Sequence, residues 1–239
     1  VWGGETLYGT IRESRRVGHI LPFCLLGGES AVREPWRAAL SAGEITLGRE
    51  NALRLFPARE AEAALLLQAS DAGINAPATT SMGRLFDAVA ALAGIHESVS
   101  FEGQAAILLE QIADEADQGK YDFALLRQDE RWIYDWRPVI KGVILDAANG
   151  VPSAKISMRF HRALAGLLEA AAETHRGETG CGQIALSGGC YQNELLLKLG
   201  VAALQSRGFT VFINRLVPCN DGGISYGQAA VAAANTNRQ

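Results

Sequence analysis

The sequence predicts a helix-rich α/β fold, and three observations support this class. The last third of the chain alternates strand-like and helix-like segments, and the middle third repeats apolar residues at helical spacing. Of the 239 residues, 48% are hydrophobic and 20% are charged, so the chain can bury a large core without disulfides. A strand–helix–strand–helix order predicts two parallel neighbouring strands with helices packed on them.

The first half of the chain begins with strands and continues with helices. Residues 1–17 mix β-forming residues with a glycine pair and predict one or two strands joined by a turn. Residues 18–35, rich in glycine and proline, predict a loop. Helical patterning then extends from residue 36 to 126 and predicts three helices, at 60–70, 81–93 and 102–118.

The second half returns to mixed structure. Residues 134–145 alternate aromatic and β-branched residues with polar ones around Pro138, which predicts a strand or two short extended segments. Ser157 is the expected N-cap of a long helix that ends near His175. The alternating block follows, with strands at 183–186 and 210–214 and helices at 193–205 and 225–234.

Composition excludes several classes of partner. The longest uncharged apolar stretches, 63–69 and 231–234, are far shorter than the roughly 20 residues that span a bilayer. A net charge of −4 favours neither nucleic acid nor an anionic membrane as a partner. The four cysteines form no CxxC pair and no secretory signal precedes them, which favours a reducing, cytoplasmic setting. Because the chain opens without Met on strand-like residues, we expect a piece of a longer polypeptide.

The sharpest local feature is the segment 185–193, ALSGGCYQN, which joins an apolar strand to a helix through Gly188 and Gly189. Glycines at such a corner let backbone N–H groups and the helix dipole approach an anion, so a phosphate or ribose-phosphate is the natural ligand. A tight turn with no ligand is an equally weighted interpretation.

Ser187 in this segment imitates a nucleophile elbow, but the hydrolase interpretation fails. A hydrolase of that fold needs its histidine after the serine, and every histidine of this chain precedes Ser187. Neither a P-loop motif nor a GxGxxG motif after a strand is present. The hydrolase, P-loop and Rossmann interpretations therefore fail, and these motifs supply no catalytic residue.

A second polar loop, 218–223, follows the last strand with the sequence PCNDGG. Asp221 stands where α/β folds bind ligands and is a candidate for a metal or phosphate contact; the alternative is an N-cap or an Asx-turn aspartate. Gly3 and Gly4 form a further glycine pair after a strand-like start, and two such loops suggest a nucleotide held between two halves. Asp87 by itself is an ordinary boundary residue, and His161 an ordinary core or boundary histidine.

These segments jointly resemble one family, the HypF-type carbamoyltransferases of nickel–iron hydrogenase maturation. The resemblance extends over nearly the whole chain and is carried, in order, by WGGE at 2–5, PF at 22–23 with LGG at 26–28, REPWR at 33–37, SMGRLFDA at 81–88, FEGQAA at 101–106, FH at 160–161, LSGG at 186–189 with QN at 192–193, and NDGG at 220–223.

The resemblance implies a fold and a domain organisation. The chain is similar to the C-terminal part of a domain that resembles threonylcarbamoyl transferases and has the ASKHA (actin-like, sugar-kinase-like) architecture, with α/β lobes around a nucleotide cleft and the N-terminal lobe incomplete. On this basis residues 1–35 are the remnant of the first lobe, 36–150 a largely helical segment, and 151–239 the β-α-β-α core of the second lobe.

The resemblance also implies an activity, partners and site residues. ATP and carbamoyl phosphate give carbamoyl-adenylate in upstream domains of the same polypeptide, and this segment transfers the carbamoyl group to the C-terminal cysteine of a HypE-type carrier protein, for cyanide-ligand synthesis. The implied substrate contacts are Gly3 and Gly4 in a glycine-rich loop, Asp87 at the nucleotide or ribose, Gly103 and Asn193, and the implied ligand of a divalent metal is Asp221.

One departure from the family pattern matters. The other metal ligands of the family, a His-x-x-x-His pair, fall before Val1, so we expect the chain alone neither to hold the metal tightly nor to turn over. Two alternatives stay open: a non-catalytic nucleotide-binding or docking module of the same fold, and a structural domain in which the Gly-Gly pairs are only turns.

Overall fold

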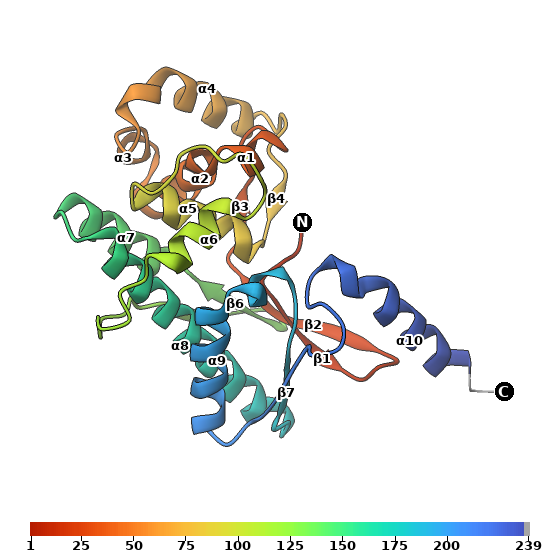
Figure 1. The fold of residues 1–239 in the computed structure, drawn as a ribbon. Coiled ribbons are helices and arrows are strands. Elements are labelled where there is room, and N and C mark those ends of the chain that lie inside the picture. Colours follow the sequence, from red (N-terminus) through yellow and green to blue (C-terminus); the bar gives the residue numbers. More distant parts are fainter. Residues whose placement is uncertain (237–239) are drawn as a thin grey trace.

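A four-stranded sheet lies at the centre of the molecule. The computed structural model describes residues 1–236. The sheet has the order β1-β2-β6-β5 and consists of β1 (Glu5–Gly9), β2 (Ser14–Ile20), β5 (Ala124–Gln128) and β6 (Arg131–Asp135) (Figure 1). β1 and β2 form the antiparallel pair that residues 1–17 predict, whereas β2 pairs with β6 in parallel. Asp129, at a φ of 51°, makes the tight turn between β5 and β6.

Two smaller sheets flank this one. β3 (Phe23–Cys24) and β4 (Ala78–Thr79) pair antiparallel. β7 (Gln183–Leu186) and β8 (Thr210–Ile213) pair in parallel and are joined by the 3-10 helix η2 (Gly189–Gln192) and by α9 (Glu194–Ser206). The parallel pair predicted from the alternating block is therefore confirmed, with boundaries within one residue.

Helices enclose the main hydrophobic core. Its largest fully buried side chains include Trp36, Phe86 and Phe160, and Phe86 and Phe160 meet edge to face at 4.9 Å between centroids. Many alanines of α2 and α5 are fully buried, which lets these two helices pack closely. The helices of this part are α1 (Ser30–Arg33), α2 (Pro35–Leu47), α3 (Arg49–Leu53), η1 (Pro57–Arg59), α4 (Glu60–Asp71), α5 (Met82–Leu92), α6 (Gln104–Gln111), α7 (Arg137–Ala148) and α8 (Ser153–Thr179).

Several sequence predictions are wrong in this part. The predicted loop 18–35 contains the end of β2, β3 and α1, and the helix predicted at 102–118 is only α6. The expected extended segment 134–145 is mostly α7, because Pro138 lies in the first helical turn, where its missing N–H leaves no bond unmade. The predicted helical pattern up to residue 126 ends in β5. Helix α8 begins at Ser153 after Pro152, so Ser157 is not its N-cap; it is fully buried, and its hydroxyl donates to the backbone oxygen of Leu109.

A polar contact ties the sheet to α8. The hydroxyl of Tyr134 lies 2.6 Å from Oγ1 of Thr6 and 2.9 Å from Nε2 of His175. Tyr134 stands beside Gly18 of β2, where a Cβ atom would meet the tyrosine hydroxyl and lie 2.6 Å from Cζ. The glycine therefore makes room for the tyrosine ring.

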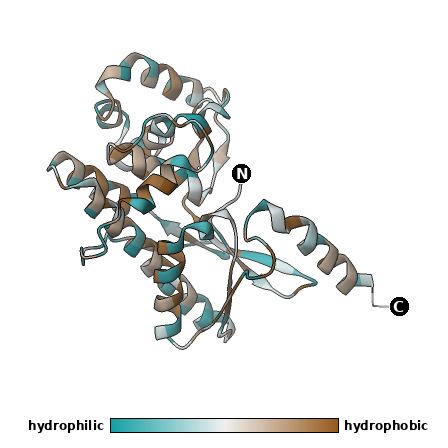
Figure 2. Ribbon diagram, viewed as in Figure 1, coloured by the Kyte–Doolittle hydropathy of each residue, from teal (hydrophilic) through white to brown (hydrophobic). Residues whose placement is uncertain are grey.

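The last helix differs from the others. α10 (Ile224–Thr236) contains no buried residue and projects from the body (Figure 1). Its exposed apolar side chains include Ile224, Tyr226 and Val231, and Figure 2 shows hydrophobic positions along it. In residues 1–236, no helix is both long enough and apolar enough to pass through a bilayer.

Candidate functional site

The glycine corner, residues 187–193, leaves open space for a ligand. Gly188 has a φ of 110°, a conformation that favours glycine. A Cβ atom on Gly188 would have no neighbour within 4 Å, and one on Gly189 would meet only Oε1 of Gln192 at 4.0 Å. The N–H of Gly188 donates to the backbone oxygen of Cys219 at 2.8 Å, so the corner is bonded to the loop that carries Asp221.

An open groove of about 1040 Å³ borders this corner. Its lining includes Ser187 and Gly188 on one side and Asn220 and Asp221 on the other. Asn220, not Asp221, is the N-cap of the short helix η3 (Asp221–Gly223), because its side chain accepts from the N–H of Gly222 at 3.1 Å. The exposed Asp221 carboxylate is therefore not occupied as that cap.

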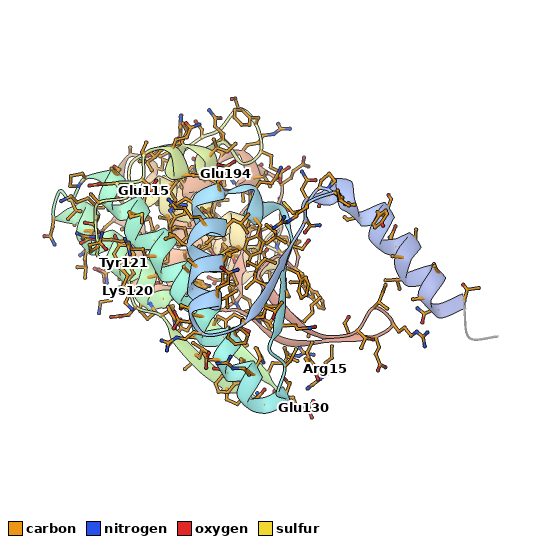
Figure 3. All side chains as sticks on the ribbon, turned by 60° about the horizontal axis from the view of Figure 1, so that its bottom comes forward. Arg15, Glu115, Lys120, Tyr121, Glu130 and Glu194 are labelled. Atoms are coloured by element: carbon orange, nitrogen blue, oxygen red, sulfur yellow. The ribbon has the colours of Figure 1, made fainter. Side chains whose placement is uncertain are left out.

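The N-terminus of α9 is satisfied by protein groups. Oδ1 of Asn193 accepts from the N–H of Leu196 at 2.7 Å, and Oε1 of Glu110 accepts from the N–H of Leu195 at 3.1 Å. Both Glu110 and Glu194 add negative charge there. Glu194 and Glu115, labelled in Figure 3, both line a smaller pocket. Since these groups neutralise the helix dipole and occupy its N–H groups, the N-terminus of α9 is not suited to an anion.

Asp87 is a buried carboxyl group with one oxygen that lacks a hydrogen bond. The residue is 2% exposed, and Nη1 of Arg84 lies 2.8 Å from its Oδ2. The approach lacks hydrogen-bond geometry, so Oδ2 has no hydrogen-bond donor among the described residues. Burial raises the pKa of Asp87 to about 6, with Arg84 opposing this shift and Glu102 adding to it.

Cys190, a residue of the glycine corner, lies next to α5, the helix that carries Asp87. A Cβ atom on Gly83 of α5 would be 3.9 Å from its Sγ. Burial raises the pKa of the Cys190 thiol to about 11, so the thiol is protonated at neutral pH. A protonated thiol is a poor nucleophile.

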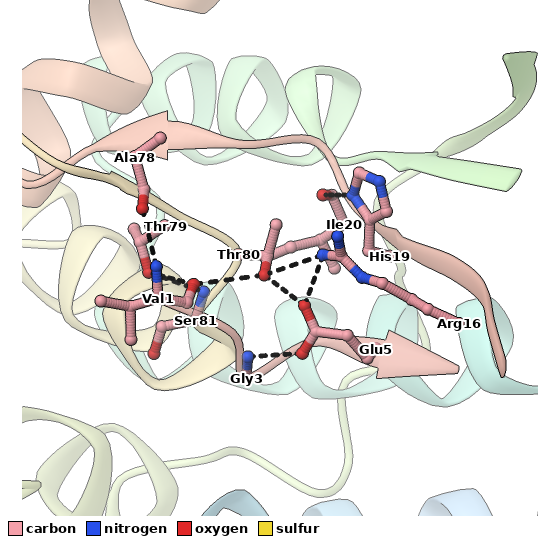
Figure 4. Close-up of polar contacts among 10 residues, drawn as sticks. All are labelled: Val1, Gly3, Glu5, Arg16, His19, Ile20, Ala78, Thr79, Thr80 and Ser81. Atoms are coloured by element: carbon pink, nitrogen blue, oxygen red, sulfur yellow. Dashed lines mark hydrogen bonds and ion pairs between the residues drawn. The ribbon is translucent and has the colours of Figure 1, made fainter. Parts of the chain in front are cut away.

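Gly3 and Gly4 pack closely against residues 80–81. A Cβ atom would lie 3.0 Å from Cα of Ser81 at Gly3 and 2.8 Å from the backbone oxygen of Thr80 at Gly4. Figure 4 shows the polar network that holds this loop, in which Glu5 receives bonds from the N–H of Gly3, the hydroxyl of Thr80 and the guanidinium of Arg16. The glycines thus have a packing role that the sequence pattern did not reveal.

The predicted site residues gather around the start of α5 and the glycine corner. The Gly3 loop contacts Ser81, which is the N-cap of α5, and α5 carries Asp87. Gly103 is the left-handed N-cap of α6, next to Glu102, whose charge reaches Asp87. Asn193 ends the glycine corner, but its amide is engaged with α9 and with His161.

The candidate metal site is incomplete in the described residues. Within positions 1–236, no three or more His, Cys, Asp or Glu side chains come together as a metal would require. Asp221 supplies a single carboxylate, whereas a divalent cation takes about six ligands or keeps several waters. These residues therefore do not fit a bound metal on their own.

Comparisons with known proteins identify the family. Residues 1–228 match the family model described as "Carbamoyltransferase, Kae1-like Domain, second subdomain". The carbamoyltransferase HypF of Synechocystis is 35% identical over 95% of this chain, and that of Rhodobacter capsulatus is 37% identical over 98%. The chain spans 31% and 30% of the length of these two relatives.

Solved structures agree in fold. A crystal structure of full-length HypF in the phosphate- and nucleotide-bound form matches with a TM-score of 0.92 at 35% identity, over 98% of this chain and 31% of that one. A HypF structure from T. kodakarensis matches with a TM-score of 0.81 at 28% identity, over 99% and 32%. The expected ASKHA-type, Kae1-like α/β fold is confirmed. The chain belongs to the HypF carbamoyltransferase family, in which it corresponds to the second subdomain of the Kae1-like domain.

Proposed function

We propose that this chain supplies one side of a site that holds ATP or carbamoyl-adenylate and transfers the carbamoyl group to the C-terminal cysteine of a HypE-type carrier protein. The observation that carries the proposal is the open glycine corner, which shares a groove with Asp221 and lies beside the helix of Asp87. A related HypF was solved with phosphate and nucleotide bound, which supports the same class of ligand here.

Each polar group has a role that suits its surroundings. The backbone N–H of Gly189 can donate to a phosphate oxygen, since no side chain fills the space there, whereas the N–H of Gly188 is bonded to Cys219 and holds the corner in place. The Asp87 carboxylate, ion-paired with Arg84 through Oδ2, is the group that would accept from a ribose hydroxyl. With a pKa of about 6, Asp87 is mostly ionised at pH 7 and is a strong acceptor.

The transfer step needs no nucleophile from this chain. The thiolate sulfur of the carrier attacks the carbamoyl carbon, a C–S bond forms, and the bond from that carbon to the phosphate oxygen breaks, so that AMP leaves with the electron pair. The thiol proton passes to solvent. The chain would contribute position and charge, which dominate catalysis when the nucleophile belongs to a partner.

A divalent metal at Asp221 belongs to the same proposal, with most of its ligands drawn from outside the described residues. When bound, such a cation would neutralise phosphate charge. Because the described residues offer one carboxylate, no step is routed through the metal. Upstream domains of the same polypeptide would supply carbamoyl-adenylate, and the cytoplasm is the proposed compartment for cyanide-ligand synthesis in nickel–iron hydrogenase maturation.

A second candidate is a non-catalytic nucleotide-binding or docking module. The lack of a three-ligand group among residues 1–236 and the exposed apolar side chains of α10 favour it. Carbamoyl transfer to a HypE-type carrier, measured after this chain is joined to the upstream domains of a relative, separates the two. Transfer above the level of those domains alone supports the enzyme, and nucleotide binding without transfer supports the module.

The first test is a calorimetric titration of the chain with ATP and with AMP, with and without Mg²⁺. A Gly189→Val substitution places a branched side chain in open space, so the protein should fold and lose nucleotide affinity by at least about tenfold. Gly182→Val is the matched control, because a Cβ atom at Gly182 also has no neighbour within 4 Å. Equal affinity of both variants contradicts the phosphate role of the corner, and no binding by the unaltered chain counts against the proposed nucleotide site.

A further inference from the structure

His161 is a fully buried imidazole whose two nitrogens both have partners. It lies on α8 with 0% exposure. Its Nδ1 is 2.8 Å from the backbone oxygen of Ser157, and its Nε2 is 2.9 Å from Nδ2 of Asn193. The sequence pattern gave this residue no function beyond that of a core histidine.

The hydrogen bonds assign one tautomer. Oδ1 of Asn193 must face the N–H of Leu196, since only an oxygen can accept there. The amide nitrogen of Asn193 therefore faces His161 and donates to Nε2. Nδ1 then carries the proton and donates to the oxygen of Ser157. The imidazole is neutral, and burial lowers its pKa in agreement with this state.

The same imidazole contacts the helix of Asp87. Its ring packs edge to face on Phe86, at 5.5 Å between centroids, and Phe86 directly precedes Asp87 in α5. On its other side, Asn193 is the residue that ends η2 and begins α9. His161 thus lies between the two groups of the candidate site, the glycine corner and Asp87.

We propose that His161 is a positioning residue of the nucleotide site, which fixes Asn193 and thereby the place of the glycine corner relative to Asp87. This inference rests on the proposed function. In this arrangement Asn193 connects the corner to two helices. Its side-chain oxygen accepts a hydrogen bond from α9, and its side-chain nitrogen donates one to His161 of α8.

Two substitutions at position 161 separate positioning from packing. The terminal amide of Gln reaches about as far as Nε2 of histidine, so His161→Gln keeps an acceptor for Asn193. Asn reaches about as far as Nδ1, so His161→Asn keeps the bond to Ser157 and loses Asn193. Both variants lose the ring, and a packing role predicts similar effects from both.

A third variant tests the link from the other side. Asn193→Ser keeps a good N-cap for α9 but is too short to reach His161. If the two residues act through one contact, the double variant His161→Asn with Asn193→Ser should be no worse than either single variant.

The experiment measures hydrogen exchange over residues 187–193, thermal unfolding and ATP affinity for the 239-residue chain and each variant. We expect faster exchange at the corner in His161→Asn and in Asn193→Ser, near-normal exchange in His161→Gln, and ATP affinity reduced about tenfold in the first two only. Similar exchange at the corner in His161→Gln and His161→Asn would overturn the inference.

The outcomes also separate this inference from the function on which it rests. Hydrogen exchange over residues 187–193, measured without ligand, tests whether His161 and Asn193 hold the corner in place. Absence of ATP binding by the unaltered chain counts against the proposed function and against a ligand role for His161, even where exchange follows the expected order. ATP binding that is equal in all variants leaves the proposed function standing and overturns the role of His161.

Discussion

Burial of the Asp87 carboxyl group reduces the stability of the fold at neutral pH. Its pKa is about 6, against an ordinary value of 3.8, because burial disfavours the charged form. Well below pH 3.8 the carboxyl is protonated in both the folded and the unfolded state, and no penalty exists. As pH rises toward 6 the unfolded state ionises first, so stability is lost, to a total of ~3 kcal/mol at neutral pH.

Asp87→Asn should therefore stabilise the chain at pH 8 while it weakens nucleotide binding. Asn keeps the shape and carries no charge to bury, although Arg84 loses its ionic partner. We expect the free energy of unfolding at pH 8 to rise by ~1–3 kcal/mol, with the gain disappearing near pH 4. Denaturant titrations at both pH values check this.

The exposed Asp122→Asn serves as the control, and its stability should stay within about 0.5 kcal/mol at both pH values. A lower stability of Asp87→Asn at pH 8 would mean that the Arg84 ion pair outweighs the cost of burial.

Two glycine substitutions should have opposite effects on the stability of the fold. In Gly4→Ala the new methyl group meets the Thr80 oxygen at 2.8 Å, and the network around Glu5 must shift, so we expect a loss of ~1–3 kcal/mol. Gly177 lies exposed in α8 with no neighbour near its Cβ position, so Gly177→Ala should gain up to ~1 kcal/mol from helix propensity. Thermal unfolding of both variants measures the contrast, and a neutral Gly4→Ala would show that the loop is not packed as described.

Helices α8 and α10 should differ sharply in local stability. α8 places Phe160, His161 and Leu164 in the core, whereas no residue of α10 is buried. Local opening costs little where few contacts are lost, so amides of α10 should exchange roughly a hundredfold faster than those in the centre of α8. Peptide-resolved hydrogen exchange measures this, and equal protection of the two helices would show that α10 is packed in solution.

Local patterns predicted some elements well and failed for others. The strand at 183–186 and the helix α5 follow from the apolar patterning of their own residues. α7 was missed because its buried Val139, Ile140 and Val143 are β-formers held in a helix by tertiary packing. The hydrophobic pattern near residue 126 likewise did not distinguish a buried helix from β5.

Site prediction failed for contacts between distant segments. The glycine corner was evident from a strand followed by two glycines and a helix. No local pattern indicated that Glu110 would satisfy the N-terminus of α9, since 85 residues separate Glu110 from Leu195. The bond between His161 and Asn193, which are 32 residues apart, was equally invisible before the fold was known.

For the molecule as a whole, two of the buried histidines, His161 and His175, should lower the free energy of unfolding at acidic pH. Burial lowers the pKa of His161 and of His175, although Glu178 partly opposes the shift of His175. Unfolded histidine has a pKa of about 6.5, so as pH falls below that value the unfolded state takes up protons that the folded state does not. The histidine contribution to the melting temperature should therefore fall on acidification below about pH 6.5 and be flat above it, while Asp87 acts in the opposite direction as pH falls toward 4.

His161→Gln and His175→Gln should each reduce the slope of melting temperature against pH between 6.5 and 5, whatever they do to the absolute value. His96→Gln is the matched control, because His96 is not among the buried side chains. An unchanged slope in both buried-site variants would assign the loss of stability at acidic pH to other groups.

The close approach of Gly18 to Tyr134 has an evolutionary consequence. Because a side chain at position 18 would collide with the tyrosine ring as well as its hydroxyl, loss of the hydroxyl alone would not make room for it. A larger residue at 18 becomes acceptable only after position 134 has lost its aromatic ring, and the contacts to Thr6 and His175 are then lost as well. In lineages of this family, position 134 should therefore lose its aromatic ring before position 18 gains a larger side chain. A larger residue at 18 then implies an earlier change at 134.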